Sequence, residues 1–204
     1  ATSRPAQMRA EYSGVPLRAI AQLAKSWNFS EASFGMAALN SYYATPSVAD
    51  EHGFALADAP WPHIFDPFRN AVAGKKVAVI GHFPFAPKAL NQAADFYMLE
   101  RSLNEGDYPD SAAEYILPEC DYVFITGSAF VNKTAPRLLE LSRESFNVVL
   151  GPSTPLAPVL LEDYGVSQVT GMVPTSPLAM FESLSGTDAA TTMFEWGHRV
   201  ELSA

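Results

Sequence analysis

The order of hydrophobic and polar positions divides the chain near Asn70. After that residue, apolar runs rich in β-branched side chains recur at regular intervals, and most of them end at Gly or a polar residue. Such runs are typical of strands buried on both faces of a parallel sheet. The strands expected from them are Lys76–Gly81, Phe96–Glu100, Tyr122–Thr126, Asn147–Gly151 and Gln168–Val173.

Helical patterns lie between and after these strands. Ser111–Leu117 begins with a capping box formed by Ser111 and Glu114, and Thr134–Ser142 begins with Thr134 as its N-cap. Thr154-Pro155 is expected to start another helix, and Phe181–Ser185 and Ala189–Trp196 are expected to be helical. The alternation predicts an α/β protein in which residues 71–204 form a Rossmann-like, doubly wound parallel sheet.

Residues 1–70 read differently, as a small N-terminal α+β domain and a connector. Leu17–Lys25 and Ser30–Tyr43 have helical periodicity, and Ser30 is the expected N-cap of the second helix. That helix carries many small residues, Gly35 among them, so another element is expected to pack very close to it. Glu51–Phe68, rich in proline and aromatic residues, has neither period and is expected to be irregular.

Composition and charge exclude several classes of partner. The net charge of −9 and pI of about 4.8 argue against nucleic acid, because an acidic surface repels the phosphate backbone. No apolar run approaches the roughly 18 residues of a membrane helix, and we expect a cytoplasmic protein, with a homo-oligomer as a candidate assembly. The one cysteine, Cys120, follows a helical pattern beside a strand and is expected to be a buried thiol.

The candidate chemistry lies after the strands, because ligands of such sheets bind beyond the carboxyl ends. His82 directly follows Gly81 at the end of the first strand, where a histidine can bind a metal or move a proton; a hydrogen bond across the loop is the alternative. Glu100 and Asp107 could add oxygen ligands, as could Glu31 from the first domain.

Two further strand ends read as anion cradles. Gly151-Pro152-Ser153-Thr154 precedes an expected helix, and Thr126-Gly127 leads through Asn132 to Thr134. Backbone N–H groups and hydroxyls at a helix start can bind anions, although plain N-capping explains both threonines equally well. Asn28 and Asn40 could face the same cleft from the first domain, with capping and helix packing as the alternative.

Glu100 follows Gly81 at about the offset of the acidic residue that holds a ribose in dinucleotide folds. The glycine fingerprint of those folds is absent, because GHFPFAP has one glycine and two prolines. Standard NAD binding is therefore not expected, but an adenosine-type cofactor stays an alternative.

Several of these segments together resemble a known family. SWNFSEASFGMAALNSYY, VAVIGHFPF, EGDYPDSAAEYILPECDYVFITGSAFVNKTAPRLLELS and VVLGPSTPLAPVLLEDYGV, in this order, are similar to the bacterial and archaeal family described as putative heavy-metal chelation. The resemblance implies a small enolase-N-terminal-like domain before the Rossmann-like domain, with a metal or tetrapyrrole site between them. In that family a β-meander precedes the segment that matches ATSRP, so we expect a longer natural chain.

The resemblance implies functional roles for a defined set of positions. They are Asn28, Glu31, Asn40, His82, Phe83, Pro84, Glu100, Gly106, Asp107, Pro109, Glu114, Thr126, Asn132, Thr134, Gly151, Pro152, Ser153 and Pro155.

Three hypotheses follow. The first is a protein that binds a divalent transition metal or a small metal chelate between the domains, with His82, Glu100, Asp107 and Glu31 as ligands. The second is an enzyme with an adenosine-type cofactor, such as S-adenosylmethionine or a nucleotide, in which His82 and Glu100 are catalytic. The third is a non-catalytic sensor of a small molecule.

Overall fold

A mostly parallel sheet forms the centre of the molecule. The computed structural model describes residues 12–61, 63–185 and 192–204. Within them the sheet has the strand order β1-β8-β7-β6-β5-β2-β3-β4. The strands are β1 (Ala55–Leu56), β2 (Lys76–Ile80), β3 (Asp95–Glu100), β4 (Tyr108–Pro109), β5 (Tyr122–Thr126), β6 (Phe146–Leu150), β7 (Gln168–Pro174) and β8 (Gly197–Ser203). The pairs from β4 to β7 are parallel, whereas β8 runs antiparallel to β7 and β1.

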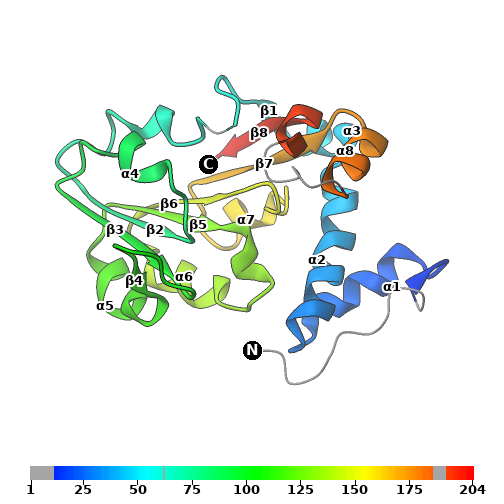
Figure 1. Cartoon of the computed structure of the whole chain (residues 1–204), viewed down its shortest axis with the longest axis horizontal. Helices are drawn as coiled ribbons and strands as arrows, with labels where there is room; N and C mark the ends of the chain where they lie inside the picture. The colour runs from blue at the N-terminus through cyan, green and yellow to red at the C-terminus, as the bar shows by residue number, and fades with distance from the viewer. Residues whose placement is uncertain (1–11, 62, 186–191) are drawn as a thin grey trace.

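Helices surround this sheet (Figure 1). The α-helices are α1 (Leu17–Ala21), α2 (Phe29–Tyr43), α3 (Pro46–Glu51), α4 (Ala86–Ala89), α5 (Ala113–Ile116), α6 (Ala135–Leu141), α7 (Val159–Glu162) and α8 (Pro177–Leu184). The short 3-10 helices are η2 (Gln22–Lys25), η3 (Asp66–Phe68), η4 (Asp110–Ala112), η5 (Leu117–Glu119), η6 (Gly127–Phe130) and η7 (Met193–Trp196). The longest of the described helices, α2, has 15 residues, and none of them could span a membrane.

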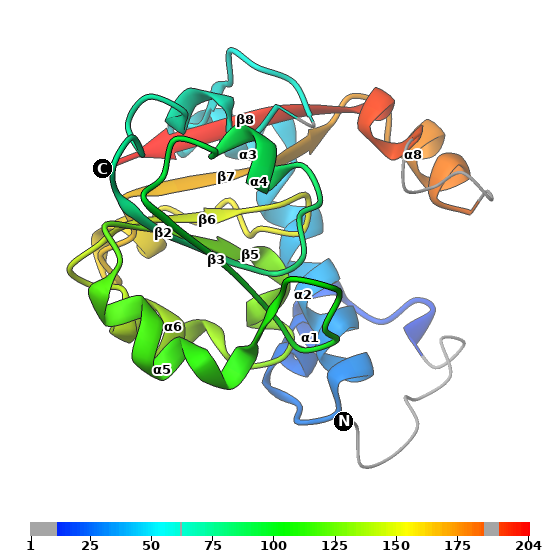
Figure 2. The same ribbon diagram turned by 60° about the vertical axis from the view of Figure 1, so that its left-hand side comes forward.

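Each face of the sheet has its own apolar core. On one face Ala78, Val123 and Ile125 pack with residues of α5, α6 and α7. On the other face Val77 and Val79 pack with α4 and with the segment that leads into β2. Figure 2 shows α5 and α6 on one side of the strands and α4 on the other. The apolar runs read from the sequence are therefore strands covered on both faces, and the α/β, Rossmann-like fold is confirmed.

Strand order creates a switch point between β2 and β5. The chain passes from β2 outward to β3 and β4, and then returns to the other side of β2 as β5. Loops that leave the carboxyl ends of β2 and β5 therefore diverge, which is where open α/β sheets bind ligands. Gly81 follows β2 and Gly127 follows β5 at this point.

The structure corrects several expected elements. The N-cap of α2 is Asn28 and not Ser30, because the Asn28 side chain accepts hydrogen bonds from the backbone of Ser30 and Glu31. Ser111 and Glu114 form no capping box: η4 precedes α5 without a side-chain cap. Glu114 instead pairs with Arg137 on α6.

The segment after β6 is also different from expectation. No helix starts at Thr154-Pro155, because residues 152–158 form a turn and extended chain before α7 begins at Val159. The α6 helix begins at Ala135, and its N-cap residue Thr134 makes no side-chain capping bond. The expected helix at Phe181–Ser185 is the second half of α8.

Two strands lie where the sequence indicated loops, and one where it indicated nothing regular. The β1 strand lies inside the expected irregular connector and pairs with β8, and β4 lies in the loop after β3. The β8 strand begins just after η7, which covers the end of the helix expected at Ala189–Trp196; residues 189–191 of that helix lie outside the described residues. The domain division near Asn70 stays a prediction, and the described residues before β1 form helices.

Candidate functional site

His82 is held in one orientation by two carboxylates. Its Nδ1 lies 3.0 and 3.1 Å from the two carboxylate oxygens of Asp107, and its backbone N–H donates to Glu100 Oε2 at 3.0 Å. Burial would raise the pKa of Asp107, but hydrogen bonds from Asn104 and His82 outweigh it and lower that pKa below its usual value. An ionised Asp107 accepts the Nδ1 proton, which leaves Nε2 of a neutral ring as an acceptor or ligand.

The Glu100 carboxylate accepts hydrogen bonds from the backbone of two loops. Besides the His82 N–H, its carboxylate accepts from the backbone N–H of Arg101 at 2.6 Å and of Ser102 at 3.3 Å. These bonds fix the turn that leaves β3 and tie it to the turn that leaves β2. The carboxylate is therefore already engaged with backbone donors at the place where a ribose contact was expected.

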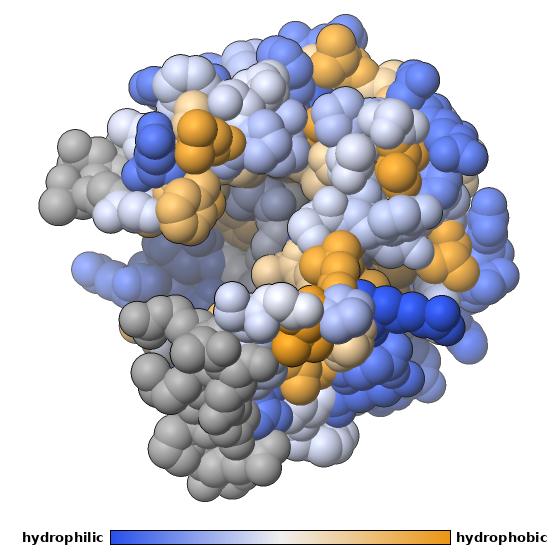
Figure 3. Space-filling model, turned by 90° about the vertical axis from the view of Figure 1, so that its right-hand side faces the viewer, coloured by the Kyte–Doolittle hydropathy of each residue, from blue (hydrophilic) through white to orange (hydrophobic). Residues whose placement is uncertain are grey.

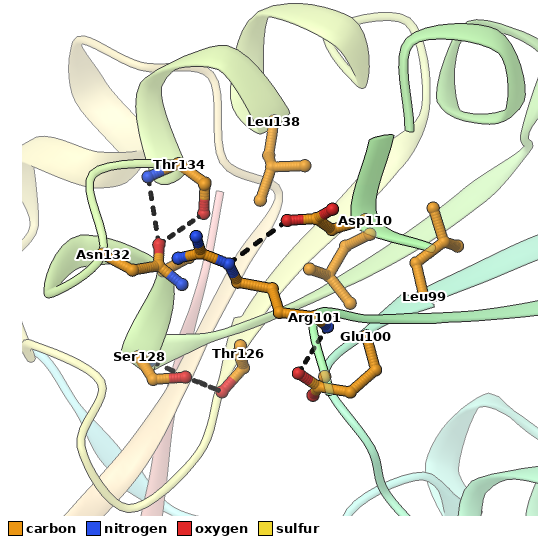
Figure 4. A pocket seen from close by; sticks show the side chains of 12 residues that line it. Leu99, Glu100, Arg101, Asp110, Thr126, Ser128, Asn132, Thr134 and Leu138 are labelled. Carbon is orange, nitrogen blue, oxygen red and sulfur yellow. Dashed lines mark hydrogen bonds and ion pairs between the residues drawn. The ribbon is translucent and has the colours of Figure 1, made fainter. Parts of the chain in front are cut away.

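A small cavity with both polar and apolar side chains in its wall lies at the switch point between β2 and β5 (Figure 4). It has a volume of about 90 Å³, and its lining includes the predicted residues Gly81, Glu100, Thr126, Asn132 and Thr134. Thr126 Oγ1 and Ser128 Oγ lie 3.0 Å apart, and Asn132 Oδ1 accepts from both the N–H and the hydroxyl of Thr134. On the opposite wall Arg101 pairs with Asp110 at 3.2 Å.

A much larger groove adjoins this cavity, and Ser128 and Asn132 line both. Its volume is about 990 Å³, and it lies between α2 on one side and α8, the loops after β5 and β6, and the end of β7 on the other. The wall is mostly apolar: Met36, Ala37, Val131, Pro152, Met172, Pro174, Pro177, Met180, Phe181 and Leu184. Figure 3 faces this side of the molecule and shows a hollow with apolar side chains at its rim.

Two polar contacts join the N-terminal helices α2 and η2 to the loops that follow β6 and β5. Asn40 Nδ2 donates to the carbonyl oxygen of Ser153 at 2.7 Å, while Asn40 Oδ1 is buried and has no hydrogen-bond partner among the described residues. Lys133 Nζ donates to the carbonyl oxygen of Ala24. Lys133 has a φ of 69°, a left-handed conformation that a non-glycine residue rarely adopts, so the contact is made at a conformational cost.

The expected anion cradle after β6 is instead a site of close backbone packing. A Cβ on Gly127 would lie 2.6 Å from the backbone nitrogen of Thr154, and Gly151 has a φ of 128°. The Thr154 N–H donates to the Gly151 carbonyl, and its buried hydroxyl has no partner among the described residues. Pro152 and Ser153 line the groove, but the structure gives this segment no helix start for binding an anion.

Four other predicted residues cap a helix, pack within the protein or lie outside both cavities. Asn28 caps α2, and Glu31 Oε2 accepts from Ser26 Oγ at 2.5 Å; both side chains are buried. Phe83 packs edge-on against Phe65, and Pro84 is exposed and lines neither cavity. The ligand roles predicted for these four residues stay predictions.

The predicted metal ligands are not gathered into one cluster. Among the described residues there is no group of three or more His, Cys, Asp or Glu side chains that could hold a metal ion. Asp107 contacts His82 through Nδ1, and Glu31 lies in the first turn of α2. The arrangement thus offers one imidazole nitrogen with an orienting carboxylate.

Sequence reasoning missed several lining residues. Ser128, Arg101 and the apolar face of α8 line the cavities, and Lys133 forms a contact between the two parts. Ser128 could have been found, because it stands between Thr126 and Asn132 in a segment already singled out. Nothing in the sequence placed α8 opposite α2, because the two helices are far apart in the chain and periodicity within one segment does not record which elements share a groove.

Comparison with known proteins gives two family matches. The model of one family described as "Putative heavy-metal chelation" matches residues 63–200, and a second with the same description matches residues 2–43. A curated relative, an uncharacterized protein of Methanocaldococcus jannaschii, is 29% identical over 101 residues, which cover 47% of this chain and 39% of that protein.

Two solved structures of proteins of unknown function are similar over the whole chain. The protein from Desulfitobacterium hafniense DCB-2 is 43% identical with a TM-score of 0.89, and this chain covers 81% of it. The protein from Pyrococcus horikoshii is 22% identical with a TM-score of 0.79 and 80% coverage, which is a likeness of fold.

Proposed function

Because the chain belongs to the family described as "Putative heavy-metal chelation", we propose that it binds a transition metal as an organic chelate, seated in the groove between α2 and α8. The size of this groove is the observation that supports the proposal. Its volume of about 990 Å³ is at the upper end of the roughly 300–1,000 Å³ of pockets that hold small organic molecules, and far exceeds a bare ion.

The chemistry of the groove fits a ligand with a large apolar body. Three methionines, Met36, Met172 and Met180, line it, and their flexible thioether side chains adapt to ligands of irregular shape. The polar groups are few, which is typical of sites where polar contacts fix orientation and apolar contacts supply area.

Polar groups at the inner end would orient the ligand. Asn40 Oδ1 is buried and has no partner in the described part of the chain, so a ligand N–H or a metal-bound water would remove the cost of leaving it unpaired. Ser128 and Asn132 belong to both the groove and the small cavity, and a polar substituent of the ligand would enter the cavity between them.

His82 is the nitrogen ligand in this proposal. His82 itself lines neither the groove nor the small cavity. Gly81, its neighbour in the chain, and Glu100, its hydrogen-bond partner, both line the small cavity, so His82 would meet the metal only at the end of the ligand that enters this cavity. The Asp107 carboxylate fixes the ring so that Nε2 carries the free electron pair, as carboxylate–histidine pairs do at metal sites. Asp107 and Glu100 then act through His82 as positioning residues.

The alternatives from the sequence have less support. An adenosine-type cofactor would need the Glu100 carboxylate for its ribose, and that carboxylate accepts three backbone N–H groups. A non-catalytic sensor would bind its small molecule in the same groove. It would differ from the main proposal only in that ligand binding changes the interaction with another protein.

The test is elemental analysis by plasma mass spectrometry together with mass spectrometry of extracted small molecules, on natively purified protein. We expect stoichiometric transition metal accompanied by an organic chelator. Ala37→Trp, at an exposed position of α2 that lines the groove, should remove both. Ser47→Trp, at an exposed position of α3 that does not line the groove, is the matched control and should retain both.

His82→Ala should lower the metal content while the organic molecule stays bound. The purified protein is also titrated with Ni²⁺ and with the nickel–phenanthroline complex, a flat apolar chelate. The proposal fails if no metal copurifies and neither probe binds at micromolar concentration, or if Ala37→Trp binds as the wild type does.

A further inference from the structure

The large groove between α2 and α8 has an uncharged wall. Charged residues make up 17% of the chain, yet none of the described residues that line the groove is Asp, Glu, Lys, Arg or His. The polar groups that a ligand would meet there are hydroxyls and amides. They belong to Ser33, Asn40, Ser41, Thr45, Ser128, Asn132 and Ser153.

Charged side chains next to the lining residues are directed elsewhere. Lys133 follows Asn132, and its Nζ donates to a backbone carbonyl of η2. Arg199 lies opposite Met172 in the pairing of β8 with β7, but its side chain is 2% exposed and lines a different cavity. Glu182 of α8 is exposed and does not line the groove. The described part of the chain therefore places no counter-ion in the groove.

The charged side chains at the inner end, in the small cavity, have partners of their own. Arg101 pairs with Asp110 at 3.2 Å, and the Glu100 carboxylate accepts three backbone N–H groups. These contacts compensate the charges within the cavity wall. A ligand that lies in the groove is thus surrounded by neutral groups along most of its length.

A charged ligand would bind in such a groove only at a cost. A charge that leaves water loses hydration, which an opposite charge or several hydrogen bonds must replace. The apolar part of the wall, which includes Met36, Met172 and Met180, offers neither. A ligand without net charge gains from the burial of apolar surface and avoids this cost.

The hydroxyls along α2 determine which polar groups a ligand can present to this wall. Ser33, Ser41 and Thr45 are exposed, line the groove and are spaced by multiples of four residues, which places them along one side. Each donates its proton to a backbone carbonyl three or four residues earlier, at 2.8, 2.9 and 3.1 Å respectively. A hydroxyl that has donated its one proton can only accept. This side of the groove therefore favours a ligand that brings hydrogen-bond donors.

We propose that the groove selects an electrically neutral metal chelate whose N–H or O–H groups face α2. In such a chelate, anionic donor atoms of the organic molecule cancel the charge of the metal. This inference rests on the proposed function, because it names the class of chelate that the same groove would bind. A cationic complex, or a chelate with free acidic groups inside the groove, would be rejected.

The test compares copper(II) chelates of similar shape and different charge by equilibrium dialysis against the full chain. Three probes are the bis complexes of 8-hydroxyquinoline that carry a methyl, an amino or a sulfonate group at ring position 5. The methyl and amino complexes are neutral, and the sulfonate complex is a dianion. The fourth probe is the dicationic bis(phenanthroline) complex. Copper is measured by plasma mass spectrometry and the chelator by absorbance, so that binding of the intact complex is recognised from their ratio.

We expect the methyl complex to bind at micromolar concentration, and the sulfonate and phenanthroline complexes at least about tenfold more weakly. The dication gives the sharper comparison, because the net charge of −9 would by itself favour a cation over a neutral ligand. The amino complex should bind about threefold more tightly than the methyl complex, because the two groups are similar in size and only the amino group can donate to the α2 hydroxyls.

A charge placed in the groove should change this selection. Ala37 lies between Ser33 and Ser41 on the groove wall and is exposed. Relative to the methyl complex, Ala37→Lys should bind the sulfonate complex about tenfold more tightly than Ala37→Gln does, because glutamine is a long side chain without the charge. Asn91→Lys adds the same charge at an exposed position that does not line the groove, and should keep the selection of the wild type. Circular dichroism checks that each variant is folded.

Failure of this inference and failure of the proposed function give different results. If the sulfonate or the phenanthroline complex binds as tightly as the methyl complex, or if Ala37→Lys and Ala37→Gln select alike, the neutral chelate is overturned while the proposed function stands. Equal binding of the amino and methyl complexes overturns the donor groups facing α2. If none of the four complexes binds at about 100 μM, the inference is overturned, and the proposed function fails with it when no metal copurifies either.

Discussion

The α2 helix packs closely against η2 at Gly35, and this contact predicts that a larger residue there lowers the stability of the protein. In the middle of α2, a Cβ built on Gly35 would overlap the backbone nitrogen of Ala24 and lie 2.5 Å from the carbonyl carbon of Leu23. The neighbours are backbone atoms of η2, which cannot rotate away as a side chain would. Gly35→Ala therefore requires that α2 and η2 move apart.

The magnitude follows from two opposing effects. Alanine in a helix interior is favoured over glycine by about 0.5–1 kcal/mol. Overpacking a well-packed site costs about 1–3 kcal/mol, and a backbone overlap belongs at the upper end. We expect a net loss of about 2 kcal/mol in the free energy of unfolding. The displaced residue Ala24 also accepts the hydrogen bond from Lys133, so contact with the loop after β5 weakens as well.

The assay is equilibrium unfolding in urea, followed by circular dichroism. Ser33→Ala on the exposed side of the same helix is the control and should change the free energy of unfolding by no more than about 0.5 kcal/mol. If Gly35→Ala is as stable as the wild type or more stable, the close approach of α2 and η2 is refuted.

Three other predictions concern residues near the ends of the sheet strands. Gly127→Ala should lower the free energy of unfolding by about 2 kcal/mol, measured in urea, because the new Cβ would lie 2.6 Å from the Thr154 backbone nitrogen. The pKa of Asp107 lies below the usual value of 3.8 for a free Asp side chain, so its contribution to stability is present above that pH and is lost as pH falls through the folded value. The stability gap between wild type and Asp107→Asn should accordingly be present at pH 7 and shrink below about pH 4 in thermal unfolding; an unchanged gap at low pH would contradict this. Burial raises the pKa of Cys120 to about 11, so iodoacetamide at pH 7.5 should label it only when urea unfolds the chain, as mass spectrometry would show.

The parallel strands could be predicted because their signal is local. Runs such as Lys76–Ile80 and Tyr122–Thr126 are apolar at nearly every position, and only a strand covered on both faces needs that pattern. The β8 strand could not be found in the same way. It carries Arg199 and Glu201 on one face, and its pairing with β7 and β1 is a long-range contact that sequence periodicity does not record.

The candidate site was predicted in part for the same reason. His82, Glu100, Asp107, Asn132 and Asn40 could be singled out because residues after parallel strands, or on a neighbouring helix, have a predictable place. Which of them meet could not be predicted. The distances depend on how the loops after β2 and β3 turn, and those turns are fixed by hydrogen bonds between the loops.

The sequence by itself determined the fold class, the edge of the sheet that carries polar residues, and the close contact at the small-sided helix. These features depend on residue type and spacing within one segment, so they can be predicted from the amino-acid sequence alone. Only the tertiary structure decided that α8 faces α2 across a large apolar groove, that Asp107 orients His82, and that Arg199 of β8 is buried. Each of these depends on segments far apart in the chain, brought together by strand order and packing.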